Sequence, residues 1–158
     1  TESTELVKLV QVGIRDYRPG EYDYVKNNIE RVTTYFDKDI KERVFEGDSW
    51  KTIVNEIVDH LPQKVYISFD IDGLDPKLCP HTGTPVQGGF ETEQIFYLFK
   101  KVALSGRQII GFDLNEVGIS ANEWDENVGA RVLFKLCNLM VAGKIINLAT
   151  VWNRTSKL

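Results

Sequence analysis

Val65-Tyr66-Ile67-Ser68-Phe69-Asp70-Ile71-Asp72-Gly73-Leu74-Asp75-Pro76 is the stretch that decides the fold. An apolar strand leads into two carboxylates, Asp70 and Asp72, and then into a Gly-Leu-Asp-Pro break. Open parallel sheets bind their ligands at the carboxyl ends of the strands. Carboxylates in such a place are costly unless a cation or hydrogen-bond donors receive them. The stretch therefore predicts a buried strand that ends at a metal site.

The composition is typical of a single globular domain. The 158 residues are 42% hydrophobic and 27% charged, which is sufficient for one hydrophobic core. A net charge of -4 and the lack of a basic stripe argue against a nucleic-acid partner. No apolar stretch has the length of a membrane span, and nothing resembles a signal peptide. Cys79 and Cys137 form no spaced pair, so we expect a reducing, cytoplasmic location.

Strand-like and helix-like patterns alternate along the chain. The expected strands cover residues 7–12, 32–36, 64–69, 109–114 and 145–152. The expected helices cover residues 21–29, 50–61, 92–104 and 126–142. Strands separated by helices favour a mainly parallel sheet with helices on both faces. We therefore expect an α/β protein with a three-layer α/β/α architecture, formed by residues 1–158 without an internal domain boundary.

Two segments have the clearest local signals. Residues 50–61 place apolar side chains at spacings of three and four, Ser49 can cap the first amides, and Pro62 ends the run. The segment 73–89 is long and rich in Gly, Pro and Thr, and such a loop inside a compact domain is usually functional. Its prolines and glycines predict a defined path for the loop.

Asp70 and Asp72 are separated by one residue, so on a strand they would point to the same side. Two carboxylates there suit a hard divalent ion such as Mg²⁺ or Mn²⁺. The alternative interpretation is an Asp-rich turn in which each side chain caps local backbone amides. An EF-hand is excluded because Gly73 follows the second acid directly and no acid closes the loop at the required distance.

A phosphatase of the haloacid-dehalogenase type is a second alternative for this stretch. That superfamily also places Asp-x-Asp-Gly after an apolar strand, which would make Asp70 a nucleophile and Asp72 a general acid. The superfamily usually has Thr or Val after the glycine and carries the motif near the amino end. Here Leu74 follows, the motif lies in the middle of the chain, and no downstream Asp-Asp pair is evident. The phosphatase is therefore the weaker hypothesis.

The wider sequence resembles the ureohydrolase family, which includes arginases, agmatinases and formimidoylglutamases. The resemblance rests on Ser68-Phe69-Asp70-Ile71-Asp72-Gly73-Leu74-Asp75-Pro76, followed by Thr82-Gly83-Thr84-Pro85 and Gly88-Gly89. Asp113-Leu114-Asn115-Glu116-Val117 is similar to a late family strand that ends in a glutamate. Val12-Gly13-Ile14-Arg15-Asp16, with Pro19-Gly20-Glu21, is similar to an earlier segment. These motifs occur in the family's order and cover most of the chain.

The resemblance implies a role for each matching residue. Asp70 would correspond to the carboxylate that bridges two Mn²⁺ ions, and Asp72 to the carboxylate on one of those ions. Glu116 would correspond to the acid that pairs with the guanidinium group of the substrate. Thr84 would line the cleft, and Glu21 would lie near the substrate or support the metal ligands from behind.

The resemblance also implies a reaction and partners. A water activated by the two Mn²⁺ ions attacks the guanidino or amidino carbon, and the intermediate collapses to an amine and urea or an equivalent amide. The implied partner is a small guanidino or amidino substrate, with no nucleic acid and no membrane. Ureohydrolases form homo-oligomers, so a homo-oligomer is expected when the fold is complete.

The sequence departs from the family in its metal ligands. Family members carry Gly-Gly-Asp-His and Asp-Ala-His-x-Asp segments in their amino-terminal half, and neither occurs here. The histidines present are His60 and His81, and neither matches a family ligand. We therefore interpret the chain as the carboxyl-terminal portion of a ureohydrolase, with the amino-terminal metal-ligand segments absent, and expect it to be inactive alone. The competing hypothesis is a non-catalytic α/β fragment or domain.

Two further residues bear on the substrate. Arg18 stands where arginases carry an acid that contacts the α-amino group, so a cation here would repel an α-ammonium and accept a carboxylate or a neutral tail. The alternative is that Arg18 points to solvent. Agmatine, guanidino acids and formiminoglutamate therefore stay open as substrates. His81, in the proline-rich loop, is a candidate to face the cleft.

Overall fold

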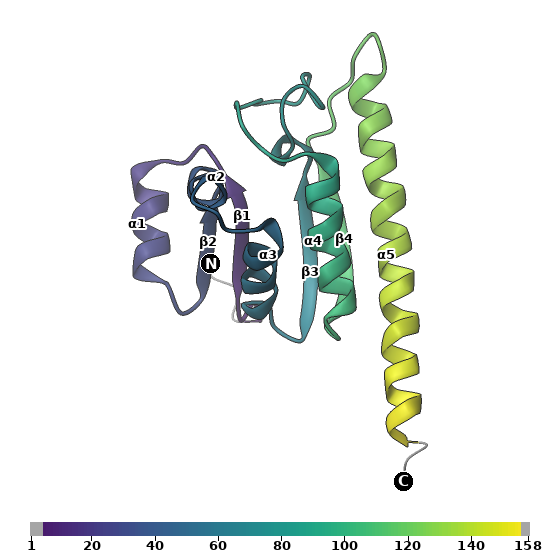
Figure 1. Ribbon diagram of the computed structural model, residues 1–158. Helices are drawn as coiled ribbons and strands as arrows, with labels where there is room; N and C mark the ends of the chain where they lie inside the picture. The colour runs from purple at the N-terminus through teal and green to yellow at the C-terminus, as the bar shows by residue number, and fades with distance from the viewer. Residues whose placement is uncertain (1–4, 156–158) are drawn as a thin grey trace.

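Strands and helices alternate along the chain in the computed structural model, which describes residues 5–155 (Figure 1). The strands are β1 (Leu9–Ile14), β2 (Val32–Phe36), β3 (Lys64–Asp70) and β4 (Gln108–Asn115). The helices are α1 (Pro19–Asn27), α2 (Asp37–Phe45), α3 (Trp50–Asp59), α4 (Thr92–Leu104) and α5 (Trp124–Thr155), with a single 3₁₀ turn, η1 (Ile71–Gly73).

All strand pairs among the described residues are parallel. β1 pairs with β2 and β3 pairs with β4, so the described strands form two two-stranded sheets. The register of the second sheet places Asp70, the last residue of β3, opposite Asn115, the last residue of β4. The expected α/β class with parallel strands is confirmed, and this register brings the carboxyl ends of β3 and β4 together.

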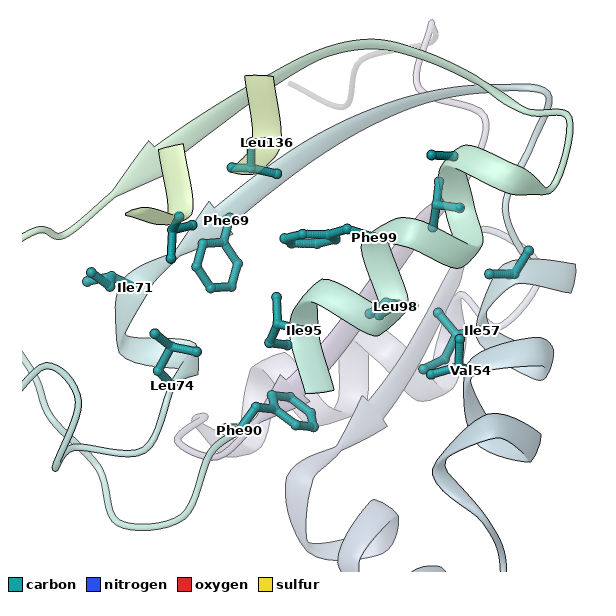
Figure 2. Close-up of a cluster of buried hydrophobic side chains, with 14 of the residues drawn as sticks. Val54, Ile57, Phe69, Ile71, Leu74, Phe90, Ile95, Leu98, Phe99 and Leu136 are labelled. Carbon is teal, nitrogen blue, oxygen red and sulfur yellow. The ribbon is translucent and has the colours of Figure 1, made fainter. Parts of the chain in front are cut away.

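The hydrophobic core lies between the β3–β4 sheet and the helices α4 and α5, and it continues between α4 and α3. Figure 2 shows Phe69 of β3 facing Phe99 of α4, with Leu136 of α5 beside them. The rings of Phe69 and Phe99 meet edge to face with their centroids 5.6 Å apart, an arrangement that aromatic pairs prefer. On the opposite face of the sheet, Tyr66 is 56% exposed. Burial on one face therefore fixes how β3 is oriented.

The helix α3 confirms the clearest local prediction. The Ser49 side chain accepts a hydrogen bond from the backbone N–H of Thr52 at 3.1 Å, as expected of an N-cap. The buried residues of the helix follow the predicted apolar stripe: Ile53, Val54, Ile57 and Val58. The carboxylate of Glu56, on the outer side, binds both terminal nitrogens of Arg43 at 2.7 and 2.8 Å, which joins α3 to α2.

The prediction of a closing strand at residues 145–152 is wrong, because α5 continues through these residues to Thr155. A short apolar run is compatible with either a strand or a buried helix, and periodicity alone does not separate the two. The helix expected at residues 126–142 stops just before Gly143, a residue type that often ends helices. Gly143 has no positive φ in the structure and lies next to α4, where a Cβ would come within 3.9 Å of the Ala103 Cβ.

Candidate metal and substrate site

The two acids of the opening stretch lie at the carboxyl end of β3, but not in the way that strand alternation predicts. The strand ends at Asp70, and Asp72 belongs to the 3₁₀ turn η1. The Asp70 Oδ1 atom accepts the backbone N–H of Asp72 at 3.1 Å, so Asp70 caps this turn. The alternative of an Asp-rich turn is thus confirmed for Asp70. The turn, rather than the pleat of a strand, brings the two carboxylates together.

The electrostatics of Asp72 indicate a cluster of like charges. Burial raises the pKa of the Asp72 carboxyl above its ordinary value, and the nearby charge of Asp70 raises it further. Glu116 adds to this shift, while Arg15 opposes it. Glu116 comes directly after β4, so it reaches Asp72 because β3 and β4 end in register. The structure therefore brings the three predicted acids to one rim of the sheet.

Arg15 is a residue at this rim whose contact the sequence did not predict. It follows β1, and its guanidinium donates to the carbonyl oxygens of Asp72 and of Gly73, the latter at 3.2 Å. Its buried Nε atom has no hydrogen-bond partner among the described residues. Arg15 therefore joins the end of β1 to the end of β3. The only signal in the sequence was a cation soon after the apolar run that predicts a strand at residues 7–12.

Glu116 is held in an unusual backbone conformation. Its backbone φ is +60°, a left-handed conformation that residues other than glycine rarely adopt. The Oγ1 atom of Thr82, a buried residue, donates to the Glu116 carbonyl oxygen at 2.9 Å. A Cβ added to Gly83 would lie 2.9 Å from the Glu116 Oε2 atom. The loop after Cys79 therefore packs directly against both the backbone and the carboxylate of Glu116.

His81 lies in the same loop and pairs with an acid that the sequence did not assign to a site. Asp125, at the start of α5, is fully buried. One of its oxygens accepts the backbone N–H of His81 and the other contacts the His81 Nδ1 atom, each at 2.9 Å. The His81 side chain is 44% exposed. Forty-four positions separate the two residues, so no local pattern in the sequence indicates that they pair.

The remaining predicted substrate residues lie on the surface. Thr84 is exposed in the loop between η1 and α4. Arg18 and Glu21 are exposed at the start of α1, where the Glu21 carboxylate accepts the backbone N–H of Arg18 at 2.6 Å. Glu21 therefore caps α1 in this structure. No contact that we find among the described residues joins Arg18 or Glu21 to the acids of the rim, so their proposed roles rest on the sequence alone.

The described residues do not form a metal site by themselves. Within residues 5–155 no group of three or more His, Cys, Asp or Glu side chains is arranged to hold a metal ion. Cys79 lies under the rim, where its thiol donates to the Ile71 carbonyl oxygen at 3.1 Å. Burial raises the pKa of this thiol to about 11, so it stays protonated and acts as a small packing group.

Comparison with known proteins identifies relatives of one kind. A sequence model of the Arginase family matches residues 2–138. Arginase-1 of Homo sapiens is 31% identical over 120 residues, which covers 76% of this chain and 36% of that protein. Agmatinase of Proteus mirabilis is 40% identical over 93 residues, covering 58% of this chain and 29% of that protein. The chain thus spans well under half the length of these relatives.

Solved structures give the same result for the fold. Proclavaminate amidino hydrolase from Streptomyces clavuligerus superimposes with a TM-score of 0.68 at 25% identity, covering 85% of this chain and 42% of that one. Arginase from Bacillus subtilis superimposes with a TM-score of 0.67 at 25% identity, covering 80% and 42%. These matches leave the haloacid-dehalogenase alternative without support. None of the helices in the described part of the chain has the length and apolar character needed to cross a membrane.

Proposed function

Because this chain belongs to the arginase family, we propose that it carries the carboxyl-terminal part of a ureohydrolase active site. The reaction is the hydrolysis of a guanidino or amidino C–N bond of a small molecule. The observation that carries this proposal is the meeting of Asp70, Asp72 and Glu116 at the paired ends of β3 and β4. These residues lie within the range that the family model matches.

The three acids have separate roles in the proposal. Asp70 and Asp72 would hold the divalent cations. Glu116 accepts hydrogen bonds from the planar guanidinium or amidinium of the substrate, a charge-assisted contact. Thr84 would line the cleft, and Glu21 would lie near the substrate or support the metal ligands from behind. Holding the planar group at a fixed place beside the cations is the chain's main contribution to the rate.

The residues of the rim fit a hard divalent cation such as Mn²⁺. Carboxylate oxygens are suitable ligands. Burial, and then the charge of Asp70, raise the pKa of Asp72, and a bound cation would reduce the cost of ionising it. When bound, two such ions would supply Lewis acidity and lower the pKa of a water. Two aspartates are too few to hold a pair of ions tightly. We therefore infer that further ligands come from outside residues 1–158, and that the chain is inactive without them.

The proposed substrate has a tail without an α-ammonium group. Arg18 would place a cation where a positive tail is disfavoured, and His81 offers a further polar contact beside the loop of Glu116. Guanidino acids and formiminoglutamate fit this preference, and agmatine, whose terminal ammonium stands where arginine has its α-ammonium, is the comparison that tests it. We further propose a cytoplasmic location, consistent with two free cysteines, and a homo-oligomer for the complete fold.

Calorimetric titration with Mn²⁺ tests the metal part of the proposal. The chain should bind Mn²⁺ weakly at one site, and the double change Asp70→Asn with Asp72→Asn should abolish binding. Asp75→Asn is a matched control, because Asp75 lies in the same loop but caps Lys77 and pairs with its ammonium group. Tight binding of two ions by this chain alone would contradict the incomplete ligand set. No binding would contradict the metal site.

Urea release tests the reaction. The chain with Mn²⁺ is expected to release no urea from agmatine, L-arginine or a guanidino acid. Mixing it with the amino-terminal part of the Proteus mirabilis agmatinase supplies Gly-Gly-x-His and Asp-x-His-x-Asp segments if the family pattern holds there. Urea release that depends on both pieces and is lost in Glu116→Gln supports the proposal. A mixture that binds Mn²⁺ without any turnover favours the non-catalytic alternative.

A further inference from the structure

The loop that follows Cys79 is attached at two points that lie far apart in the sequence. One point is Asp125 at the start of α5, which binds both the backbone N–H and the imidazole of His81. The other is Glu116 after β4, whose carbonyl oxygen accepts the Thr82 hydroxyl. We call residues 81–83 the 81–83 segment. It therefore links a buried acid to the proposed guanidinium ligand.

Asp125 is buried more completely than its sequence position requires. An acid at a helix N-terminus is stabilised by the helix dipole when exposed, yet Asp125 is 0% exposed. A buried carboxylate is costly unless hydrogen bonds satisfy it, and here both oxygens bind His81 at 2.9 Å. Glu126, its neighbour, is an ordinary acid of this kind, because it binds the backbone N–H and hydroxyl of Ser120. Both oxygens of Asp125 are therefore used to bind the 81–83 segment.

The 81–83 segment packs tightly enough to determine where Glu116 lies. A Cβ on Gly118 would come within 2.0 Å of the His81 carbonyl oxygen, so the two loops meet backbone to backbone. A Cβ on Gly83 would come within 2.9 Å of the Glu116 Oε2 atom. Glu116 itself has a φ of +60°, which needs support from its surroundings. The Thr82 hydrogen bond supplies that support at the Glu116 carbonyl.

We infer that Asp125 is a positioning residue, which acts through His81 and Thr82 to hold Glu116 in its strained conformation beside Asp72. This inference rests on the proposed role of Glu116 as the guanidinium ligand. The imidazole of His81 turns its Nδ1 atom toward Asp125, which leaves the opposite nitrogen for solvent or substrate. Loss of the Asp125 carboxylate should free the 81–83 segment and let the Glu116 carboxylate leave the rim.

Two variants break the connection at different points, and two more serve as controls. Asp125→Asn removes one of the two carboxylate oxygens that bind His81, and Thr82→Val removes the hydroxyl that binds the Glu116 carbonyl while keeping a similar side-chain shape. Thr82→Ser keeps the hydroxyl and should behave as the original chain. Glu126→Gln changes the adjacent acid, which contacts Ser120 rather than His81. Mn²⁺ affinity and agmatine affinity are measured for each, the latter from the ¹³C shift of the Glu116 carboxylate.

The inference predicts a split between the two affinities. Asp125→Asn and Thr82→Val should weaken agmatine binding roughly fivefold, the size of one lost hydrogen bond, and leave Mn²⁺ binding unchanged. Thr82→Ser and Glu126→Gln should change neither. Equal loss of both affinities in the first two variants would show a merely structural role and overturn the inference, as would no change in either.

A separate readout distinguishes failure of the inference from failure of the proposed function. If agmatine leaves the Glu116 signal of the original chain unmoved, the proposed function is overturned. The positioning is then judged from the backbone amide signals of Glu116 and Val117. Asp125→Asn should shift both signals and Glu126→Gln should not. Unshifted signals in Asp125→Asn would overturn the positioning role as well.

Discussion

Asp72 is the residue in which the chemistry of the rim is most visible. Its carboxyl is partly withdrawn from water, faces the charge of Asp70 and receives only partial compensation from Arg15. Such a group is costly in a metal-free chain, because burial and like charges both disfavour ionisation. Carboxyl groups whose ionisation is disfavoured without metal are typical of cation sites, because a bound cation stabilises the ionised form.

Replacing Asp72 should therefore stabilise the metal-free chain. The pKa of Asp72 is raised in the folded state, so the folded chain binds more protons than the unfolded one above the ordinary value of 3.8. Stability consequently falls as pH rises through this window. Asp72→Asn removes this pH-dependent loss of folding stability. It should therefore raise Tm at neutral pH by about 1–2 °C, allowing for screening by solvent.

Thermal unfolding followed by circular dichroism measures this effect. The gain should vanish below pH 3.8, where Asp72 is protonated in both states. Asp75→Asn is the control and should give no gain, because Asp75 caps Lys77 and pairs with it. A lower Tm for Asp72→Asn at neutral pH would contradict the electrostatic account.

Gly83 provides a second prediction at this scale. A Cβ here would lie 2.9 Å from the Glu116 Oε2 atom, the far end of a flexible side chain. Gly83→Ala should therefore displace the Glu116 carboxylate without disturbing the fold. We expect a changed ¹³C shift of that carboxylate and weaker agmatine binding, with Tm within about 1 °C of the original, as is usual for surface substitutions.

Gly20→Ala is the matched control, because nothing lies within 4 Å of a Cβ at Gly20. It should leave the Glu116 signal unmoved. An unchanged Glu116 signal in Gly83→Ala would show that the carboxylate does not rest against the 81–83 segment.

At the scale of elements, the packing of α4 on β3 stabilises the end of the strand that carries Asp70. Phe99 of α4 meets Phe69, one residue before Asp70, in an edge-to-face contact (Figure 2). Phe99→Ala should cost about 3–5 kcal/mol of unfolding free energy, as expected for a buried aromatic. Phe134→Ala is the control, because Phe134 is 69% exposed on α5. Urea denaturation measures both, and equal effects would contradict the core described.

The long helix α5 gives a prediction of opposite sign. Because α5 is continuous past Gly143, Gly143→Ala should stabilise the chain by about 0.5–1 kcal/mol, since alanine is the better helix former. The added Cβ has room, since it would make an ordinary contact of 3.9 Å with Ala103. A helix that ended at Gly143 with a left-handed cap would instead be destabilised by alanine. Urea denaturation distinguishes the two signs.

Local sequence patterns predicted the elements that have a clear cap, apolar stripe or apolar run. The stripe and cap of α3 predict it closely, and the apolar run of β3 predicts its position to within a residue. The prediction of a strand at residues 145–152 was wrong because a short apolar run fits a strand and a buried helix equally well. The prediction that Asp72 continues the strand was also wrong. Asp72 lies in a 3₁₀ turn that the Asp70 side chain caps.

At the scale of the whole molecule, the site depends on contacts between distant segments. The resemblance to ureohydrolases named Asp70, Asp72 and Glu116, and the pairing of β3 with β4 brings them to one rim. It did not indicate Arg15 as a link to β3, or Asp125 as the partner of His81. Such contacts join residues 44 or more positions apart and leave no local pattern. They follow from tertiary packing alone.

Paramagnetic NMR with Mn²⁺ tests the central claim most directly. A Mn²⁺ ion bound at the rim should broaden the amide signals of residues 70–73 and of residues 115–118 together, since both loops lie beside Asp72. The double change Asp70→Asn with Asp72→Asn should abolish this broadening, and Asp75→Asn should preserve it. Broadening spread over other surface acids, or confined to one of the two loops, would contradict a shared cation and guanidinium site.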